Sequence, residues 1–178
     1  MVVGSGYAKI EKKKRGDRSM KPSELRDVTD SCRIRIDKEG KWYYEDQEIV
    51  NPLVLLTFCN ALQKDEDGRY RIVFQSEVCY VEVEDTPFVV ASIRGDQETE
   101  LLVLLNTGEV HKLDPETLSI GEHNVMYCLL PDGMKVRFSR AAYYLLALMM
   151  EENEHGDIVL TIGDKSYKIP PSVCPGQE

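Results

Sequence analysis

Acidic side chains gather in the sequence just before residue 86. Residues 67–88 read DGRYRIVFQSEVCYVEVEDTPF and place Glu82, Glu84 and Asp85 within four positions. Carboxylates that converge in a cleft can hold a metal ion or transfer a proton. Because Glu82 and Glu84 alternate with valines, they share one face of a strand, and we expect that face to meet solvent. Asp85 ends the strand before a Thr-Pro pair, where it serves either as a turn residue or as a ligand contact.

The remaining motifs supply no catalytic group. An EF-hand built on the Asp-Glu-Asp-Gly run at 65–68 would need Gln63 and Phe74 as ligands, and neither can fill that role. The histidines fall at expected strand ends or turns, and no nucleophile elbow, Walker motif or dinucleotide-binding motif is present. We therefore expect no enzyme activity, no cofactor and no metal site.

A cation stands at the expected start of the second helix. Arg140 follows Ser139, a good helix N-cap, and its charge opposes the helix dipole in the first turn. Such a residue favours an anionic partner, which is either an acid from the other half of the chain or a phosphate or carboxylate of a ligand. Aromatic and charged residues near helix starts and strand ends complete a candidate ligand-binding set. The set is Arg140, Tyr144, Trp42, Tyr44, Glu77 and Asp85.

The charge distribution limits the partners of the protein. The 178 residues include 22 Lys and Arg against 31 Asp and Glu, a net charge of −9. Residues 1–30 hold 8 of these bases and 5 of these acids, which leaves 14 against 26, a net −12, for the rest. An acidic body makes nucleic acid an unlikely partner.

The cysteines and the apolar runs indicate a cytoplasmic protein. The five cysteines are odd in number, lie mostly in apolar runs and form no CxxC pair, so we predict that they are reduced and buried. No uncharged run is long enough to cross a bilayer, and no apolar stretch follows the N-terminal basic residues. We expect neither a membrane span nor a secretory signal.

Strand and helix patterns follow a short basic tail. Residues 1–30 have no sustained apolar period and form a predicted mobile tail. Its basic run at 12–15 is either a solvated leader or a contact for phosphate or an acidic partner. A hairpin is predicted at 33–49, an apolar helix at 53–62, and a second hairpin at 70–83.

The last third of the chain repeats this plan at a constant offset. Asn51 and Ser139, which suit helix N-caps, differ by 88 positions, and so do Gly68 and Gly156. The second helix is expected at 141–150, and the apolar strand residues after it keep the same offset. These matches predict an α+β fold of two ββαββ-like units that arose by internal duplication.

The two predicted units are unequal. The N-terminal α+β unit takes residues 31–86 and the C-terminal unit residues 87–178. Two or three further strands, with turns near residues 95–96 and 106–108, extend the sheet of the C-terminal unit.

Two blocks of residues follow a known pattern. The first runs Ile-x-Ile-Asp, Gly-x-Trp-x-Tyr, an apolar helix, Asp-Gly-x-Tyr, a Glu, and Val-Glu-Asp-x-Pro-Phe, and the second reads Arg-Ala-x-x-Tyr-x-Leu. The matching residues are Ile34, Asp37, Gly40, Trp42, Tyr44, Leu53 to Leu56, Asp67, Gly68, Tyr70, Glu77, Val83 to Asp85, Pro87, Phe88, and Arg140 to Leu146. Over about residues 33–170 the chain thereby resembles the bacterial family catalogued as domain of unknown function 1285.

The sequence departs from the family pattern at two places. Asn51 stands where the family tends to have an Arg, and the usual Thr-Pro-Val-Glu turn reads Phe-Gln-Ser-Glu at 74–77, so a ligand contact through that Arg is not carried over. No activity is established for the family. The resemblance implies a duplicated α+β architecture whose C-terminal half is loosely pleckstrin-homology-like, with a cleft between the halves for a nucleotide-like ligand in a signalling context.

Together these patterns favour one functional class over another. We expect a non-catalytic ligand-binding or regulatory protein whose site lies between its two halves and takes a nucleotide-like small molecule. The alternative is an interaction module that binds a protein through a sheet edge or the tail, without a small-molecule site.

Overall fold

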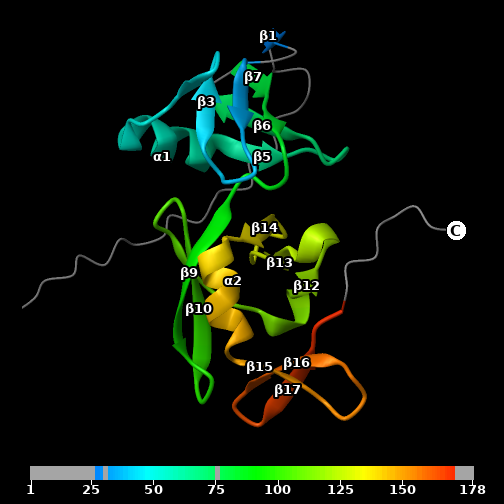
Figure 1. The fold of residues 1–178 in the computed structure, drawn as a ribbon. Coiled ribbons are helices and arrows are strands. Elements are labelled where there is room, and N and C mark those ends of the chain that lie inside the picture. The colour runs from blue at the N-terminus through cyan, green and yellow to red at the C-terminus, as the bar shows by residue number, and fades with distance from the viewer. Residues whose placement is uncertain (1–26, 30–31, 75–76, 171–178) are drawn as a thin grey trace, which may run out of the picture.

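The chain folds into two stacked units joined by one short segment. The structure, a computed structural model, describes residues 27–29, 32–74 and 77–170. The N-terminal unit contains helix α1 and the C-terminal unit contains helix α2, and residues 84–88 run between them (Figure 1). The α+β class predicted from the sequence is confirmed.

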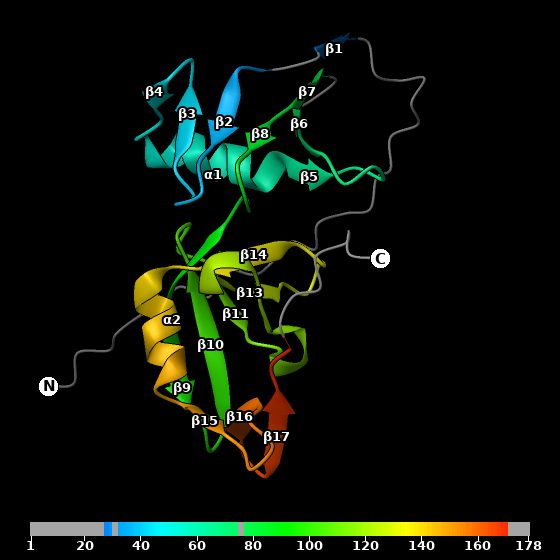
Figure 2. The ribbon, with the colours of Figure 1, turned by 45° about the vertical axis from the view of Figure 1, so that its right-hand side comes forward.

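Two small sheets and one helix build the N-terminal unit. One sheet has the order β4-β3-β2-β8 and the other the order β1-β7-β6-β5, with α1 beside them (Figure 2). The elements are β1 (Asp27–Thr29), β2 (Ile34–Ile36), β3 (Trp42–Tyr44), β4 (Gln47–Glu48), α1 (Pro52–Ala61), β5 (Leu62–Lys64), β6 (Tyr70–Phe74), β7 (Glu77–Tyr80) and β8 (Glu82–Val83). Strand β1 lies within the segment expected as a tail and pairs in parallel with β7.

A six-stranded sheet forms the body of the C-terminal unit. Its order is β11-β10-β9-β14-β13-β12, α2 packs against β9 and β14, and a separate sheet β15-β16-β17 lies at the far end (Figures 1 and 2). The elements are β9 (Val89–Asp96), β10 (Glu100–Leu105), β11 (Val110–Lys112), η2 (Pro115–Thr117), β12 (Ser119–Ile120), η3 (Glu122–Asn124), β13 (Met126–Leu129), β14 (Lys135–Phe138), α2 (Arg140–Ala147), β15 (Met150–Glu152), β16 (Ile158–Ile162) and β17 (Lys165–Lys168).

Both helices begin where their caps predict. The side-chain oxygen of Asn51 accepts hydrogen bonds from the backbone N–H of Leu53 at 3.0 Å and of Val54 at 3.4 Å. The hydroxyl of Ser139 accepts one from Ala142 N–H at 3.1 Å. These bonds satisfy N–H groups that have no partner inside the helix. The predicted end of α2 at residue 150 is wrong, because the helix ends at Ala147 and Met150 opens strand β15.

The same arrangement follows each helix. Strands β5, β6 and β7 and strands β15, β16 and β17 pair in the same antiparallel order, and the corresponding strands are offset by 88 positions throughout. In the N-terminal sheet, β1 adds a fourth strand beside β7. Three strands therefore follow each helix among the described residues, where the sequence pattern predicted two. The additional strands, β5 and β15, are short. Each starts at an apolar residue that the sequence pattern had assigned to the end of the predicted helix.

One contiguous core runs through both units. It includes Ile36 and Trp42 of the N-terminal unit, Phe88 of the joining segment, and Val90 and Leu146 of the C-terminal unit. Burial of such side chains is the main favourable contribution to folding. The two units are therefore held together by packing as well as by the chain that joins them.

The helices also expose apolar side chains. On α1, Leu53 is 73% exposed and Leu56 is 47% exposed; on α2, Tyr144 is 65% exposed. Residues 50–62 carry no charged side chain at all. Neither helix of the described residues is long and apolar enough to cross a membrane.

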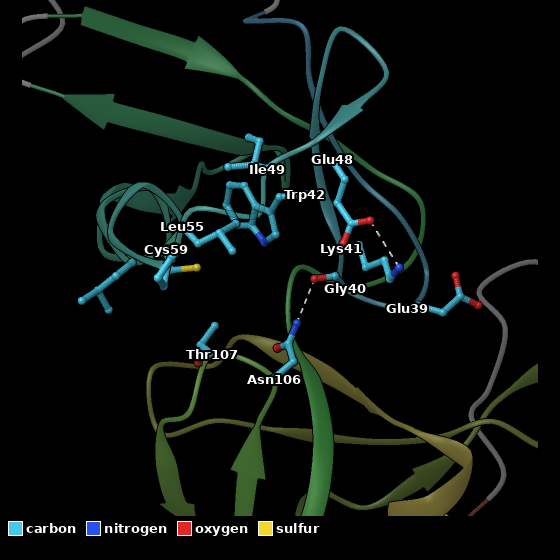
Figure 3. Close-up of a pocket in the computed structure, with 12 residues that line it drawn as sticks. Glu39, Gly40, Lys41, Trp42, Glu48, Ile49, Leu55, Cys59, Asn106 and Thr107 are labelled. Atoms are coloured by element: carbon cyan, nitrogen blue, oxygen red, sulfur yellow. Dashed lines mark hydrogen bonds and ion pairs between the residues drawn. The ribbon is translucent and has the colours of Figure 1, made fainter.

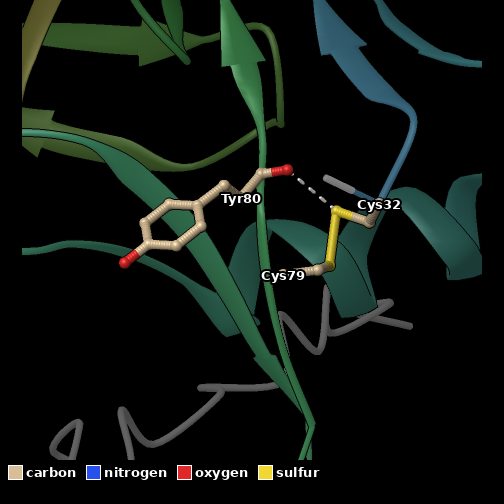
Figure 4. Close-up of a disulfide and its surroundings, with 3 residues drawn as sticks. All are labelled: Cys32, Cys79 and Tyr80. Carbon is tan, nitrogen blue, oxygen red and sulfur yellow. Dashed lines mark hydrogen bonds between the residues drawn. A yellow bond between two sulfur atoms is a disulfide. The ribbon is translucent and has the colours of Figure 1, made fainter. Parts of the chain in front are cut away.

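Two of the five cysteines form a disulfide. Cys32, just before β2, is bonded to Cys79 of β7, with 5.2 Å between their Cα atoms (Figure 4). The sulfur of Cys32 also lies 3.2 Å from the backbone oxygen of Tyr80. The prediction that all five cysteines are reduced is therefore wrong for this pair, because the fold brings together two residues 47 positions apart. Cys59 and Cys128 are buried thiols, as predicted, and burial raises the pKa of Cys128 to about 12.

Two predictions concern residues outside the described ranges. The basic run at 12–15 and Cys174 both lie there.

Candidate functional site

The joining segment is tied to the N-terminal unit by Glu84. Its carboxylate accepts a hydrogen bond from Arg35 Nη1 at 2.8 Å and one from Lys38 N–H at 3.2 Å. The side chain is 45% exposed, so the pair with Arg35 is worth little energy by itself but fixes a direction for the chain. Glu82 is exposed to solvent, as expected. Glu84 is exposed as well, but its carboxylate also binds the N-terminal unit.

The next residue, Asp85, binds the C-terminal unit. Its Oδ2 atom accepts hydrogen bonds from Arg137 Nη1 at 2.9 Å and from the hydroxyl of Tyr127 at 3.0 Å. Arg140, one of the residues that an acid from the other half of the chain could have met, lies exposed at the start of α2, and none of the ion pairs found among the described residues includes it. Asp85 thus combines the predicted turn position with a structural ion pair.

Burial and the nearby carboxylate change the acidity of Tyr127. Burial first, and then the negative charge of Asp85, raise the pKa of Tyr127 from its ordinary value of 10.0 to about 12. The phenol therefore stays protonated and donates to Asp85 at any physiological pH. This cluster of Asp85, Arg137 and Tyr127 is a docking point for the chain.

A second contact between the units involves Gly40. Its backbone oxygen accepts a hydrogen bond from Asn106 Nδ2 at 2.8 Å, while Asn106 Oδ1 accepts one from Val89 N–H at 3.1 Å. Gly40 is buried and has a φ of +77°, and a Cβ there would lie 2.6 Å from Asn106 Nδ2. Only glycine allows the two units to approach this closely in that conformation.

A pocket opens beside this contact, between the two units (Figure 3). Its volume is about 320 Å³, near the lower end of the range for small-molecule sites. The N-terminal unit supplies most of the lining and the β10–β11 turn supplies the rest. The lining residues are Glu39, Gly40, Lys41, Trp42, Glu48, Ile49, Pro52, Leu55, Leu56, Cys59, Asn106 and Thr107.

One wall of the pocket is apolar. It is formed by Trp42 of β3 and by the side of α1 that carries Leu55, Leu56 and Cys59. Trp42 is 3% exposed and stacks on Phe58 of the same helix, with 6.3 Å between the ring centroids. The stacking holds the indole in one orientation beneath the pocket.

Two polar atoms beside the pocket have no partner. Trp42 Nε1 and Thr107 Oγ1 are both buried and make no hydrogen bond within the part of the chain that the structure describes. A buried donor without a partner costs about 1–3 kcal/mol, so each atom is a place where a bound group would gain energy. Figure 3 shows the indole nitrogen on the side of the ring that faces the C-terminal unit.

The rim of the pocket is charged. Lys41 Nζ lies 3.4 Å from Glu48 Oε2, and the negative charge of Glu48 raises the pKa of Lys41. Glu39 points away from Trp42 (Figure 3). The rim therefore offers one cation that is already paired and two carboxylates that do not converge. Among the described residues, no three His, Cys, Asp or Glu side chains gather as a metal site would require.

The structure brings only part of the predicted set to this pocket. Trp42 lines it. Tyr44 is 50% exposed at the end of β3, Glu77 is exposed at the start of β7, and Arg140 and Tyr144 lie on the outer surface of α2. Asp85 is engaged in the docking cluster. These five residues do not line the pocket, and contact between any of them and a ligand stays a prediction.

Sequence reasoning missed Asn106 and Thr107. Both belong to an Asn-Thr-Gly stretch that the pattern identified only as a turn. Asn is common in turns for local reasons, so no sequence signal distinguishes this Asn from one that bridges two units.

The fold and the pocket define an unequal two-unit α+β protein with a cleft at the junction. Within that class, residues 22–86 match the model of the domain of unknown function DUF1285, N-terminal domain. The resemblance predicted from the sequence is thereby confirmed for the N-terminal unit. No curated protein matches the chain.

Two solved structures share the fold. A DUF1285 family protein from Silicibacter pomeroyi DSS-3 aligns over 80% of this chain and 82% of its own, with a TM-score of 0.68 and 19% identity. A DUF1285 family protein from Shewanella baltica OS155 aligns over 65% of this chain and 90% of its own, with a TM-score of 0.56 and 23% identity. The first alignment spans more of the chain than either unit alone provides, so the two-unit arrangement is part of the shared fold.

Proposed function

We propose that the protein is a non-catalytic ligand-binding protein whose site is the pocket between its two units. The observation that carries the proposal is the pair of buried polar atoms, Trp42 Nε1 and Thr107 Oγ1, which come from different units and both lack a partner beside the pocket. A ligand that satisfies both would bind across the junction and favour one relative position of the units. A regulatory role in signalling follows from such a coupling.

The family resemblance implies a nucleotide-like ligand, whose base and phosphate would meet different parts of the pocket. The apolar wall suits a base or another flat group. The rim offers only Lys41 as a cation, and that residue is paired with Glu48, whereas phosphate groups are usually held by several unpaired donors. A nucleoside fits the pocket better than a nucleotide does.

Tryptophan fluorescence tests the proposal directly, because Trp42 is the only tryptophan in the chain. A small-molecule library that includes nucleosides, nucleotides and cyclic nucleotides is screened for changes in emission and for thermal stabilisation. Leu56→Arg, which places a long charged side chain on the lining, should abolish any effect. The matched control is Leu53→Arg, on the same helix and 73% exposed but outside the lining. No response from any compound, or an equal response in the two variants, would count against the site.

A second candidate function is protein binding through the exposed apolar side chains of the helices. Leu53 on α1, 73% exposed, and Leu148 at the C-cap of α2, 67% exposed, favour it because large exposed apolar side chains can mark interaction surfaces. A partner captured by the wild type and lost with Leu53→Arg, but not with Leu56→Gln, would favour this function over the pocket.

The helix and the three strands after it have the same order in both halves of the fold. We infer an internal duplication from the constant offset of 88 positions between the two helix-and-sheet segments, which includes both caps. We infer the pleckstrin-homology-like character of the C-terminal unit and a bacterial origin from the family resemblance, and a cytoplasmic setting from the pattern of cysteines and apolar runs in the sequence.

A further inference from the structure

The pocket combines a buried donor with a carbon-rich wall. Trp42 Nε1 can only donate a hydrogen bond, and the hydroxyl of Thr107 can donate or accept one. The group that satisfies Trp42 must therefore be an acceptor, such as a carbonyl oxygen. A ligand bearing only donors at that end would leave the indole N–H without a partner.

The charges around the pocket oppose an anionic acceptor. Glu39 and Glu48 lie on the rim, and the single cation, Lys41, is already paired with Glu48. The chain as a whole carries a net charge of −9. A carboxylate or phosphate moved into this apolar surrounding would lose its hydration without gaining an unpaired cation in return. The acceptor must be uncharged.

The wall extends beyond the pocket along α1. Leu55 and Leu56 line the pocket, and Leu56 is also 47% exposed, next to the exposed Leu53 on the same charge-free helix. An aliphatic chain can leave the pocket along this surface and stay in contact with carbon atoms. A compact polar molecule would leave this apolar surface of α1 exposed to water.

From these features we infer that the pocket binds an uncharged acyl compound, an amide or an ester, with its carbonyl oxygen at Trp42 and Thr107 and its aliphatic chain along α1. The inference rests on the proposed function, because it names the ligand class of the same pocket. Both polar atoms are covered in the structure, so the lining side chains, Leu55 among them, shift when the carbonyl enters. Such side-chain adjustments are common on binding.

The test compares three probes that differ in one feature each. Octanamide carries the neutral carbonyl and the chain, sodium octanoate carries the same chain with a charge, and adenosine monophosphate carries a flat base with a phosphate. Fluorescence titration at pH 7.5 should give a dissociation constant for octanamide at least tenfold lower than that for octanoate. Adenosine monophosphate should give no saturable change.

Variants assign the contact to the named atoms. Thr107→Val keeps the shape and removes the hydroxyl, and Trp42→Phe removes the donor. Each should weaken octanamide binding about fivefold, the effect of one neutral hydrogen bond, in calorimetric titrations on protein whose circular dichroism matches the wild type. Leu56→Arg should abolish binding and Leu53→Arg should weaken it by less than threefold.

The outcomes separate the two proposals. Equal affinities for octanamide and octanoate, or full affinity in Thr107→Val, would overturn the acyl inference. If adenosine monophosphate or another compound binds in a manner sensitive to Leu56→Arg and octanamide does not, the pocket is a site and the ligand class is wrong. If no compound of the wider screen binds, both proposals fail.

Discussion

Gly40 occupies a position that no other residue fits. An added Cβ would lie 2.6 Å from Asn106 Nδ2 and 2.8 Å from Val89 Cγ2, and the backbone has a φ of +77°. Gly40→Ala should therefore lower the free energy of unfolding by about 2–4 kcal/mol, through backbone strain and overpacking together. Urea denaturation followed by far-ultraviolet circular dichroism measures the change.

Gly133 provides the matched control for Gly40. It has nearly the same φ, +80°, but nothing lies within 4 Å of an added Cβ. Gly133→Ala should cost only the backbone component, about 1 kcal/mol. Equal losses in the two variants would mean that the close approach of the units at Gly40 contributes nothing to stability.

The contact between Asp85 and Tyr127 should make the free energy of unfolding fall at alkaline pH. The folded pKa of Tyr127, about 12, lies above its ordinary value of 10.0. The stability that comes from the protonated phenol is therefore complete below pH 10 and is lost as the pH rises toward 12. In Asp85→Asn, the pKa of Tyr127 should fall but stay raised, because burial is the larger cause. Carbon-13 NMR of labelled tyrosine rings measures it.

The same variant tests the ion pair at neutral pH. Asp85→Asn leaves Arg137, whose side chain is 19% exposed, without its carboxylate partner. The expected loss of stability is about 2 kcal/mol. A variant as stable as the wild type, with an unshifted Tyr127 resonance, would refute the docking role of Asp85.

Among the elements, the starts of the helices were predictable and the end of α2 was not. Asn51 and Ser139 act locally, through bonds to residues two and three positions ahead, so the sequence pattern contains the whole cause. Apolar residues such as Leu148 and Met150 suit a buried position in a strand as well as one in a helix. What ends α2 is the pairing of Met150 with Leu160, which is a tertiary contact. A short apolar run cannot distinguish the two states.

Except for Trp42, the residues that line the pocket escaped prediction for the same physical reason. Trp42 was identified as one of the aromatic and charged residues near helix starts and strand ends. Asn106 reaches Gly40 across 66 positions of sequence, and nothing local to either residue requires that contact. Asp85 binds Arg137, and not Arg140, because β14 pairs in parallel with β9 immediately after the joining segment.

The disulfide joins elements that the sequence keeps far apart. Cys32 and Cys79 close a loop across 47 positions, and closing a loop of that size stabilises the folded state by about 4 kcal/mol in the chain-entropy description. Reduction of the disulfide with dithiothreitol should therefore lower the free energy of unfolding of the wild type by about 4 kcal/mol, which is measured as a lower midpoint of urea denaturation. The Cys32→Ser/Cys79→Ser variant should already have the lower midpoint and should not respond. A wild type that is reduced, as shown by thiol labelling, without any loss of stability would contradict this.

At the scale of the whole molecule, two neighbouring carboxylates hold two different units. Glu84 binds Arg35 of the N-terminal unit, and Asp85 binds Arg137 and Tyr127 of the C-terminal unit. Because the two residues are adjacent in the chain, the direction of one peptide fixes the relative orientation of the units. The contact of Gly40 with Asn106 then closes the junction from the other side and leaves the pocket between these points.

Removing both carboxylates should therefore uncouple the units. The wild type, with one contiguous core, is expected to unfold in a single calorimetric transition. Glu84→Gln/Asp85→Asn should broaden or split this transition, with a calorimetric enthalpy above the van't Hoff value, and should increase the radius of gyration in small-angle X-ray scattering. Glu82→Gln, at an exposed position on the same stretch, is the control and should leave both measurements unchanged. A double variant that keeps one sharp transition and the original scattering curve would mean that core packing alone sets the orientation of the units, and that the acidic residues next to the Thr-Pro pair have no part in it.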